Sequence, residues 1–454
     1  MDGIIQFITD FLGTPAILIG VIILVGLLAQ RKTADEVIRG TLKGILGFVI
    51  LGAGAGVLVG SLDYFGALFQ EAFGLQGVVP NNEAITALAL DDYATVTAGI
   101  MVIGMGANIL IARFSKLKYI FLTGHHTLFM AALFAVVLRV AGLHEVLVYI
   151  AGGLGLGLVM ALFPALAQPT MRKITGNDDI ALGHFSTVTY LISAKIGQIV
   201  GKGSKSTEEA KFPKGLSFLR DSSIAIALTM LVMFLIVTIV AGPAFIETGL
   251  GVTQNFIIFS IIQSITFAAG VYIVLQGVRM VIAEIVPAFK GFSERIVPEA
   301  KPALDCPVVF PFAPNAVLIG FLVSFVGGIV GMVVLILVNA DNVILPGVVP
   351  HFFVGATAGV FANATGGRRG AVIGSFINGL LLTFLPLLLM PVLGDLGFAN
   401  TTFGDADFVA IGVPVGLLAG FNANVAAAAI IILFTIPFVH GFLTRNKKVK
   451  VETK

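Results

Sequence analysis

Two short, proline-broken stretches carry carboxylates inside a strongly apolar sequence. The longer one, residues 304–316, reads Leu-Asp-Cys-Pro-Val-Val-Phe-Pro-Phe-Ala-Pro-Asn-Ala and holds the carboxylate of Asp305 and the amide of Asn315. Its three prolines each remove a backbone donor and oppose regular helix. A carboxylate near a bilayer centre costs about 2.5–3.5 kcal/mol, and irregular backbone at that depth requires surrounding protein or a water-filled cavity. We therefore predict that residues 304–316 form the floor of a transport site.

The second stretch, residues 77–84, reads Gly-Val-Val-Pro-Asn-Asn-Glu-Ala and contains Asn82 and Glu83. Two broken segments in corresponding positions of a membrane protein are a sequence signature of a substrate site. The alternative is a solvated position, with Glu83 in an outside loop and Asp305 at the membrane interface after a basic segment.

Histidines follow glycine at two places, Gly124-His125-His126 and Gly183-His184. Glycine allows close backbone approach, and imidazole both donates to and accepts from hydroxyl groups. We expect His125 and His184 to contact a polyhydroxylated ligand, whereas His126 is equally consistent with a cap at the membrane interface.

Catalytic and cofactor chemistry has little support in the sequence. The single cysteine, Cys306, has no histidine close in sequence to activate it and is better interpreted as a small buried apolar residue. No Cys/His cluster has the spacing of a metal site, and no nucleotide-binding motif is present. We therefore expect no catalytic residue, metal, cofactor or nucleic-acid partner.

The chain that must position these residues has the composition of a polytopic membrane protein. Of its 454 residues, 57% are hydrophobic and 11% charged, and the mean hydropathy is +1.03. The first span is expected to be retained, because residues 1–12 are not those of a cleavable signal. Apolar runs long enough to cross a bilayer predict an all-α fold of about eleven transmembrane helices. They cover residues 15–30, 41–62, 95–114, 119–141, 145–166, 223–245, 256–282, 316–338, 343–362, 370–393 and 408–442.

Basic residues alternate between the two sides of these spans. One set of connections contains no lysine or arginine at all: residues 63–92, 142–144, 248–254, 339–342 and 394–407. The opposite set contains nearly every basic residue, Arg139 being the exception. By the positive-inside rule, the protein lies in the cell membrane with its amino terminus outside and its carboxyl terminus inside.

A weak internal repeat is present at a spacing of about 224 residues. Residues 50–54 resemble 274–278, and residues 120–124 resemble 343–347. At this spacing Asn81, in the stretch 77–84, aligns with Asp305. Corresponding spans run in opposite directions, so the repeats are inverted, as in alternating-access transporters. We predict a first repeat over residues 1–222, including its cytoplasmic connection, and a second over 223–454, including the basic tail.

These residues together resemble the membrane (IIC) component of the ascorbate-specific phosphotransferase system, with the galactitol type more distant. The resemblance covers nearly the whole chain. It rests on Leu122-Thr-Gly-His125, Leu182-Gly-His184, Gln276-Gly-Val-Arg-Met280, Asp305-Cys306, Phe312-Ala-Pro-Asn-Ala-Val317 and Gly359-Val-Phe-Ala-Asn363.

The resemblance implies a homodimer in which a core domain with re-entrant hairpins moves against a scaffold domain. It also implies a sugar substrate that a separate cytosolic IIB protein, charged by IIA at the expense of phosphoenolpyruvate, phosphorylates as it emerges. No chemistry then resides on this chain. The matching positions place the sugar against Asn82, Glu83, His125, His184 and Asp305.

Three departures from the family pattern concern the substrate. Phe129 and Phe185 stand where ascorbate carriers tend to have glutamine, and Asn82-Glu83 replaces Thr-Tyr. Both phenylalanines therefore belong to the predicted substrate-binding set. L-Ascorbate is the first candidate, although a carboxylate at Glu83 is unfavourable beside an anion. Galactitol or another polyol is the alternative substrate.

Two other functions fit parts of this pattern. An ion-gradient-driven carrier would use Glu83 and Asp305 as coupling sites, and it would need no phosphocarrier. A membrane scaffold or receptor has no need of two costly intramembrane carboxylates.

Overall fold

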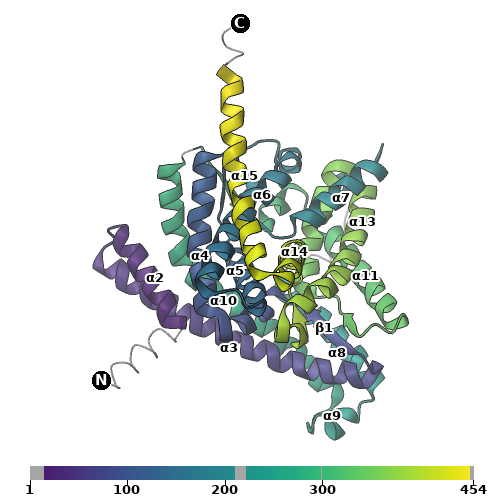
Figure 1. Cartoon of the computed structure of the whole chain (residues 1–454). Coiled ribbons are helices and arrows are strands. Elements are labelled where there is room, and N and C mark those ends of the chain that lie inside the picture. The colour runs from purple at the N-terminus through teal and green to yellow at the C-terminus, as the bar shows by residue number, and fades with distance from the viewer. Residues whose placement is uncertain (1–14, 210–220, 298, 450–454) are drawn as a thin grey trace, which may run out of the picture.

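The computed structural model describes residues 15–209, 221–297 and 299–449 (Figure 1). Within them the chain is overwhelmingly helical, and seven helical segments are long and apolar enough to cross a membrane. Three shorter apolar helices accompany these seven. The all-α membrane class predicted from composition is therefore confirmed. The predictions for residues 1–12 and for the last five residues of the basic tail lie outside the described residues.

Four helices form one packed group: α2 (Pro15–Ala29), α3 (Ala34–Phe73), α8 (Ser222–Ala241) and α10 (Phe256–Ile296). The long α3 begins at a capping box made by Thr33 and Glu36 and ends at Gly74, whose positive φ of 67° terminates the helix. A short helix, α9 (Phe245–Thr248), links α8 to α10. We call α2, α3, α8 and α10 the long-helix group.

The other helices form two packed sets. α4 (Asn82–Phe114) packs against α5 (Gly124–Val140) and α6 (Glu145–Thr175). α13 (Ala356–Leu389) packs against α7 (Thr187–Val200) and α11 (Pro314–Leu337). Glycines allow the close approach, since a Cβ on Gly201 would lie 2.1 Å from the Cα of Gly366.

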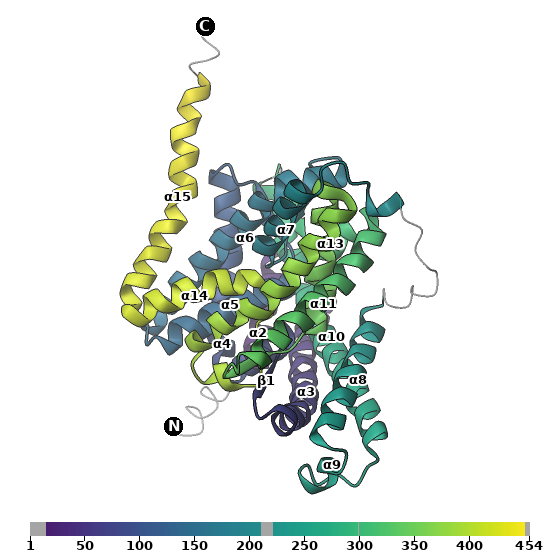
Figure 2. The ribbon, with the colours of Figure 1, turned by 90° about the vertical axis from the view of Figure 1, so that its right-hand side faces the viewer.

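The carboxyl-terminal part contains α14 (Ala406–Phe421) and α15 (Ala423–Val449), and α15 extends away from the rest of the molecule (Figure 2). The remaining short pieces are single turns. They are η1 (Thr207–Glu209), η3 (Cys306–Phe312), α12 (Val348–Pro350), the π-helical η4 (His351–Gly355), η5 (Met390–Val392) and η6 (Gly394–Phe398).

Six short strands form two parallel three-stranded sheets. They are β1 (Gln76–Pro80), β2 (Tyr119–Phe121), β3 (Ala181–Leu182), β4 (Lys301–Leu304), β5 (Asn342–Ile344) and β6 (Thr401–Thr402). The strand orders are β5-β1-β6 and β2-β4-β3. Each central strand comes from one half of the chain and both of its neighbours come from the other half. These ladders supply the backbone hydrogen bonds that non-helical segments need away from water.

The eleven predicted spans correspond to helices of the structure, with two differences in how the helices are divided. Segments 343–362 and 370–393 fall in one helical stretch, Val348–Val392, which is kinked at Gly367 with φ 56° and ψ −150°. A backbone strap, residues 204–209, lies against this kink, and Arg368 N donates to the Lys205 carbonyl over 2.8 Å. The last segment, 408–442, is divided at Asn422 between α14 and α15. Apolar runs locate the helices, but they do not show whether two neighbouring runs form one kinked helix or two separate helices.

Candidate functional site

The strands of both sheets lead directly into one cavity. Asn82 and Glu83 follow β1, His125 and His126 follow β2, and His184 follows β3. Asp305 follows β4, Val349 and Pro350 follow β5, and Asp405 follows β6. Because strands in a parallel sheet end at the same edge, residues far apart in sequence converge there.

The cavity has a volume of about 260 Å³ and mixes charged, imidazole and aromatic groups. Its charged lining comprises three carboxylates and one guanidinium, that of Arg279 on α10. Among the lining residues, Arg279 alone comes from the long-helix group. The full set is Asn82, Glu83, His125, His126, Phe129, His184, Arg279, Asp305, Pro307, Val349, Pro350, Phe353 and Asp405.

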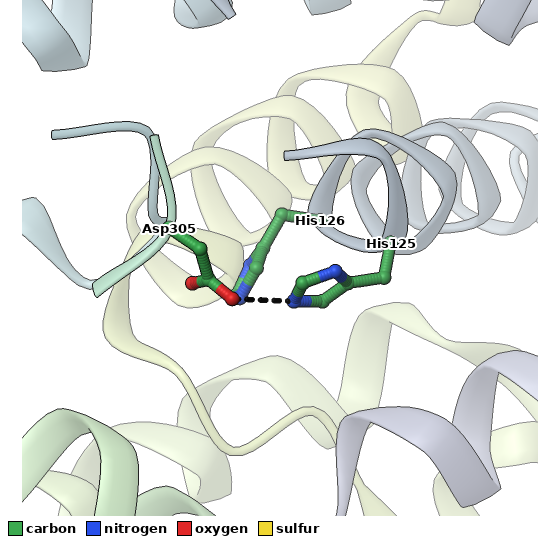
Figure 3. A group of neighbouring side chains, drawn as sticks. All are labelled: His125, His126 and Asp305. Carbon is green, nitrogen blue, oxygen red and sulfur yellow. Dashed lines mark ion pairs between the residues drawn. The ribbon is translucent and has the colours of Figure 1, made fainter. Parts of the chain in front are cut away.

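His125 and Asp305 form a direct pair at the partly exposed side of the cavity. His125 Nε2 lies 3.2 Å from Asp305 Oδ2, and the two side chains are 26% and 34% exposed (Figure 3). The other carboxylate oxygen of Asp305 accepts from the backbone N of Cys306 over 2.7 Å. Asp305 therefore caps η3 while it holds the His125 imidazole toward the cavity. Cys306 is fully buried, as expected for a small apolar residue.

A second histidine and carboxylate cluster lies deeper. His126, His184 and Asp405 have side chains only 2–4% exposed. The rings of His126 and His184 are 3.9 Å apart between centroids, and His184 Nδ1 shares a 2.8 Å hydrogen bond with the Tyr190 hydroxyl. His126 is thus a buried cavity residue and not a cap at the membrane interface.

The Asn81-Asn82-Glu83 turn joins β1 to α4. The side chain of Asn81 caps α4 by accepting from Ala84 N over 2.8 Å, and Asn82 Oδ1 accepts from Gly404 N over 2.8 Å. Glu83 is 5% exposed, and its Oε2 has no hydrogen-bond partner in the described part of the chain. The solvated-loop alternative for Glu83 is therefore wrong, and the cavity holds an unpaired acceptor.

Six of the eight predicted substrate-binding residues line the cavity, and two lie elsewhere. The six are Asn82, Glu83, His125, Phe129, His184 and Asp305. Phe185 is fully buried behind the wall and stacks on Phe121, with 4.8 Å between ring centroids. Asn315 begins α11, where its amide Nδ2 donates to the Thr207 carbonyl over 3.2 Å.

Sequence reasoning missed Asp405 and Arg279 as cavity residues. Asp405 lies in a segment that reads as an outside connection, and Arg279 lies in a span interpreted as ending at the basic side. Each offered a signal, because Asp405 is an acidic residue between apolar runs and Arg279 belongs to the Gln276–Met280 motif. Nearby Asp407 is buried and accepts from Thr187 N and Val188 N, which fixes the start of α7 beside His184.

Comparison with known sequences gives the family. Residues 10–407 match the profile of the EIIC-GAT family, described as the sugar-specific permease component of the phosphotransferase system (PTS). The chain belongs to this family. The family predicted from the Gly-His, Asp-Cys and Phe-Ala-Pro-Asn-Ala motifs is therefore confirmed, and the protein is a multi-pass membrane protein of this permease family.

A curated permease is similar over most of the chain. It is the "Ascorbate-specific PTS system EIIC component" of Mycoplasma pneumoniae, with 28% identity over 433 aligned positions. The alignment covers 83% of this chain but only 64% of the relative, so the chain spans less than two thirds of that protein's length.

Proposed function

We propose that this permease binds a small sugar or sugar acid in the cavity and moves it across the membrane for phosphorylation by a separate IIB protein. The observation that carries the proposal is the convergence of three carboxylates and three imidazoles at the ends of five strands enclosed by apolar helices. Such groups bind hydroxyls through directed hydrogen bonds, while Phe129 and Phe353 supply apolar walls.

Inverted repeats are the proposed basis of alternating access. The first residues of β1 and β4 differ by 225 positions, those of β2 and β5 by 223, and those of β3 and β6 by 220. Equivalent strands occupy equivalent places in the two sheets, which supports repeats over 1–222 and 223–454 with about eleven spans in all. The last spacing aligns His184 with Gly404 in the repeat register.

The proposed movement is a displacement of a core against a scaffold. The core comprises α4–α7, α11 and α13 with the two sheets, and the scaffold is the long-helix group. A wider, more open groove of about 550 Å³ adjoins the cavity and shares His125, Arg279 and Asp305 with it. This groove lies at the ends of β2 and β4, next to Asp305. β2 begins directly after Lys118, on the basic side of the molecule. The conformation is therefore interpreted as open toward the cytoplasm.

The phosphoryl group is carried by partners in this proposal. IIA and IIB proteins deliver it, a homodimer is the expected assembly, and the permease only binds, orients and releases the sugar. The orientation of the sugar hydroxyls falls to the carboxylates and imidazoles, which accept and donate hydrogen bonds without reacting.

Two substrates remain candidates. L-Ascorbate comes first because the Mycoplasma pneumoniae permease is named for it. A neutral polyol such as galactitol is favoured by the unpaired Oε2 of Glu83 and by the excess of carboxylates over guanidinium in the cavity. A hydroxyl could donate to that oxygen, whereas an anion would be repelled.

The deciding experiment measures uptake of labelled ascorbate and of a polyol panel into cells, with and without the IIA and IIB partners. Phosphorylated product that requires the partners supports the proposal and identifies the substrate. Accumulation of free sugar that needs only an ion gradient would overturn the phosphotransferase mechanism and establish a secondary carrier. Absence of uptake and of binding for the whole panel would revive the scaffold alternative.

A further inference from the structure

We propose that His126, His184 and Asp405 form a binding site for a divalent transition-metal ion, of the zinc class, on the inner wall of the sugar cavity. The sequence contains no metal motif of local spacing, and the three residues belong to α5, to the loop after β3 and to the loop after β6. Folding alone brings two imidazole nitrogens and a carboxylate oxygen together.

The distances match ligands placed around an ion. His126 Nδ1 lies 3.9 Å and His184 Nε2 lies 3.8 Å from the same oxygen, Asp405 Oδ2. Both separations exceed a hydrogen bond. Two ligands that are each about 2.1 Å from a tetrahedral zinc ion are about 3.4 Å apart, so each histidine nitrogen must approach Asp405 Oδ2 by about 0.5 Å. The three ligand atoms all lie within 4.8 Å of one another.

An unpartnered buried nitrogen points to a ligand at this place. His126 Nδ1 is inaccessible and has no hydrogen-bond partner among the described residues. A buried polar atom left unsatisfied costs about 1–3 kcal/mol, so native structures rarely retain one. The adjacent His125 and Asp305 differ, because at 3.2 Å they already contact each other directly.

Two neighbours hold the ligands as supporting residues do in metal sites. Tyr190 OH lies 2.8 Å from His184 Nδ1, which leaves Nε2 to face the site. Asn82 Oδ1 accepts from Gly404 N over 2.8 Å, next to Asp405, and holds the segment that carries this carboxylate. Such partners fix the orientation of a metal-binding imidazole or carboxylate.

The charge of the cavity also favours a cation. Three carboxylates line it, against the guanidinium of Arg279. With all three carboxylates ionised, negative groups would exceed the two positive groups, Arg279 and a protonated His125, by one (3 − 2 = 1). Uncompensated charge in a buried site is costly, and a divalent ion offsets it.

The donor set indicates the kind of metal and its role. Two imidazoles and one carboxylate are the ligands of open zinc sites, in which a fourth position takes water or substrate. All three residues line the cavity, so that position faces the space for the sugar. Binding of a sugar hydroxyl at that position is the one step that rests on the proposed function; the metal site itself does not.

The test uses the full-length permease, purified in lipid nanodiscs and stripped with a chelator. ZnCl₂ alone is titrated by calorimetry, and bound zinc is counted by elemental analysis. The proposal expects about one tight equivalent per chain. His126→Ala and Asp405→Asn should each abolish this equivalent. His125→Ala, which alters the adjacent pair, and His351→Ala, a buried histidine outside the cavity, should retain it.

Tyr190→Phe keeps the test decisive if Asp405→Asn fails to fold. It retains all three ligands, and it should weaken zinc binding about 10–100-fold at unchanged stoichiometry. Wild-type protein without a tight equivalent, or an equivalent that survives His126→Ala, would overturn the site. Loss with His125→Ala would assign the metal to the His125, His126 and Asp305 group instead. None of these readouts depends on transport, so failure of the metal site and failure of the proposed function are separate results.

Discussion

His125 Nε2 lies 3.2 Å from Asp305 Oδ2, although 180 residues separate the two in the chain (305 − 125 = 180). The contact exists because β2 and β4 are neighbours in one parallel sheet, with Phe121 opposite Ala303. Each residue follows its strand within four positions. The pair therefore joins the two halves of the chain at the cavity, next to the groove that opens from it.

Replacing Asp305 tests the pair directly. In the proposed site the Asp305 carboxylate accepts a hydrogen bond from a sugar hydroxyl. Asp305→Asn removes the charge from this hydrogen bond, which is worth about 1.5–3 kcal/mol, so sugar affinity should fall roughly 10-fold to 150-fold. The measurement is equilibrium binding of the labelled substrate to membranes. Asp35→Asn, which alters an exposed pair with Arg39, is the matched control and should leave affinity unchanged. Equal affinity of Asp305→Asn and wild type would remove Asp305 from the site.

Phe129 should influence which sugar is accepted. Its ring lines the cavity and meets the rings of His125 and His126 edge-on at 5.8 and 5.7 Å. Phe129→Gln adds an amide that can donate to an acidic sugar, and it should raise uptake of ascorbate relative to a polyol several-fold. Competition between the two labelled substrates measures this ratio.

The matched control is Phe185→Gln, at a position packed among Phe121, Phe163 and Phe408. An amide there is buried without water, so it should lower the melting temperature and leave the substrate ratio unchanged. If the substrate ratio changed in Phe185→Gln alone, then Phe185, and not Phe129, would face the sugar.

Asn315 should matter for helix α11 rather than for the sugar. Its backbone N, together with that of Ala316, donates to the Glu208 carboxylate over 3.0–3.2 Å. A carboxylate at a helix amino terminus is worth about 0.3–1 kcal/mol. Glu208→Gln should therefore make the strap at 204–209 more susceptible to limited proteolysis.

Sugar affinity should stay within about twofold of wild type in both Glu208→Gln and Asn315→Ala, since neither side chain lines the cavity. Glu209→Gln, on the same strap, provides the comparison for proteolysis. A tenfold loss of affinity in Asn315→Ala would return that residue to the substrate-binding set.

Asp178 should give stability a defined pH dependence. Arg172, Lys301 and Gln168 hydrogen-bond its carboxylate and hold its pKa well below the usual 3.8. A depressed pKa stabilises the fold fully above the ordinary value, and this contribution is lost as the pH falls through the folded value. Since the side chain is 43% exposed, the effect should be small.

Asp178→Asn should lower the melting temperature equally at about pH 7 and about pH 5, and the difference from wild type should shrink below pH 3.8. Thermal unfolding followed by intrinsic tyrosine fluorescence measures it. Asp179→Asn, on the next residue, should show no such trend. A difference that grows in acid would contradict the assigned ion pairs.

The sequence by itself determined the class, the family and six of the thirteen cavity residues. Apolar runs and proline-broken carboxylate stretches are local signals, because the cost of a charge in lipid depends on each residue's own surroundings. Asp305, Glu83, His125 and His184 could therefore be selected without knowing any contact. The motifs around them gave the family.

Only the tertiary structure decided which groups meet. Asp405 and Arg279 reach the cavity because β6 pairs with β1 and because α10 packs against α4 and α5, and Phe185 and Asn315 are directed elsewhere by the same packing. Pairing between strands more than 120 residues apart leaves no periodic pattern in either strand, since each is only two to five residues long. The physical reason is that such contacts depend on the relative placement of the two halves, which no local window of sequence contains.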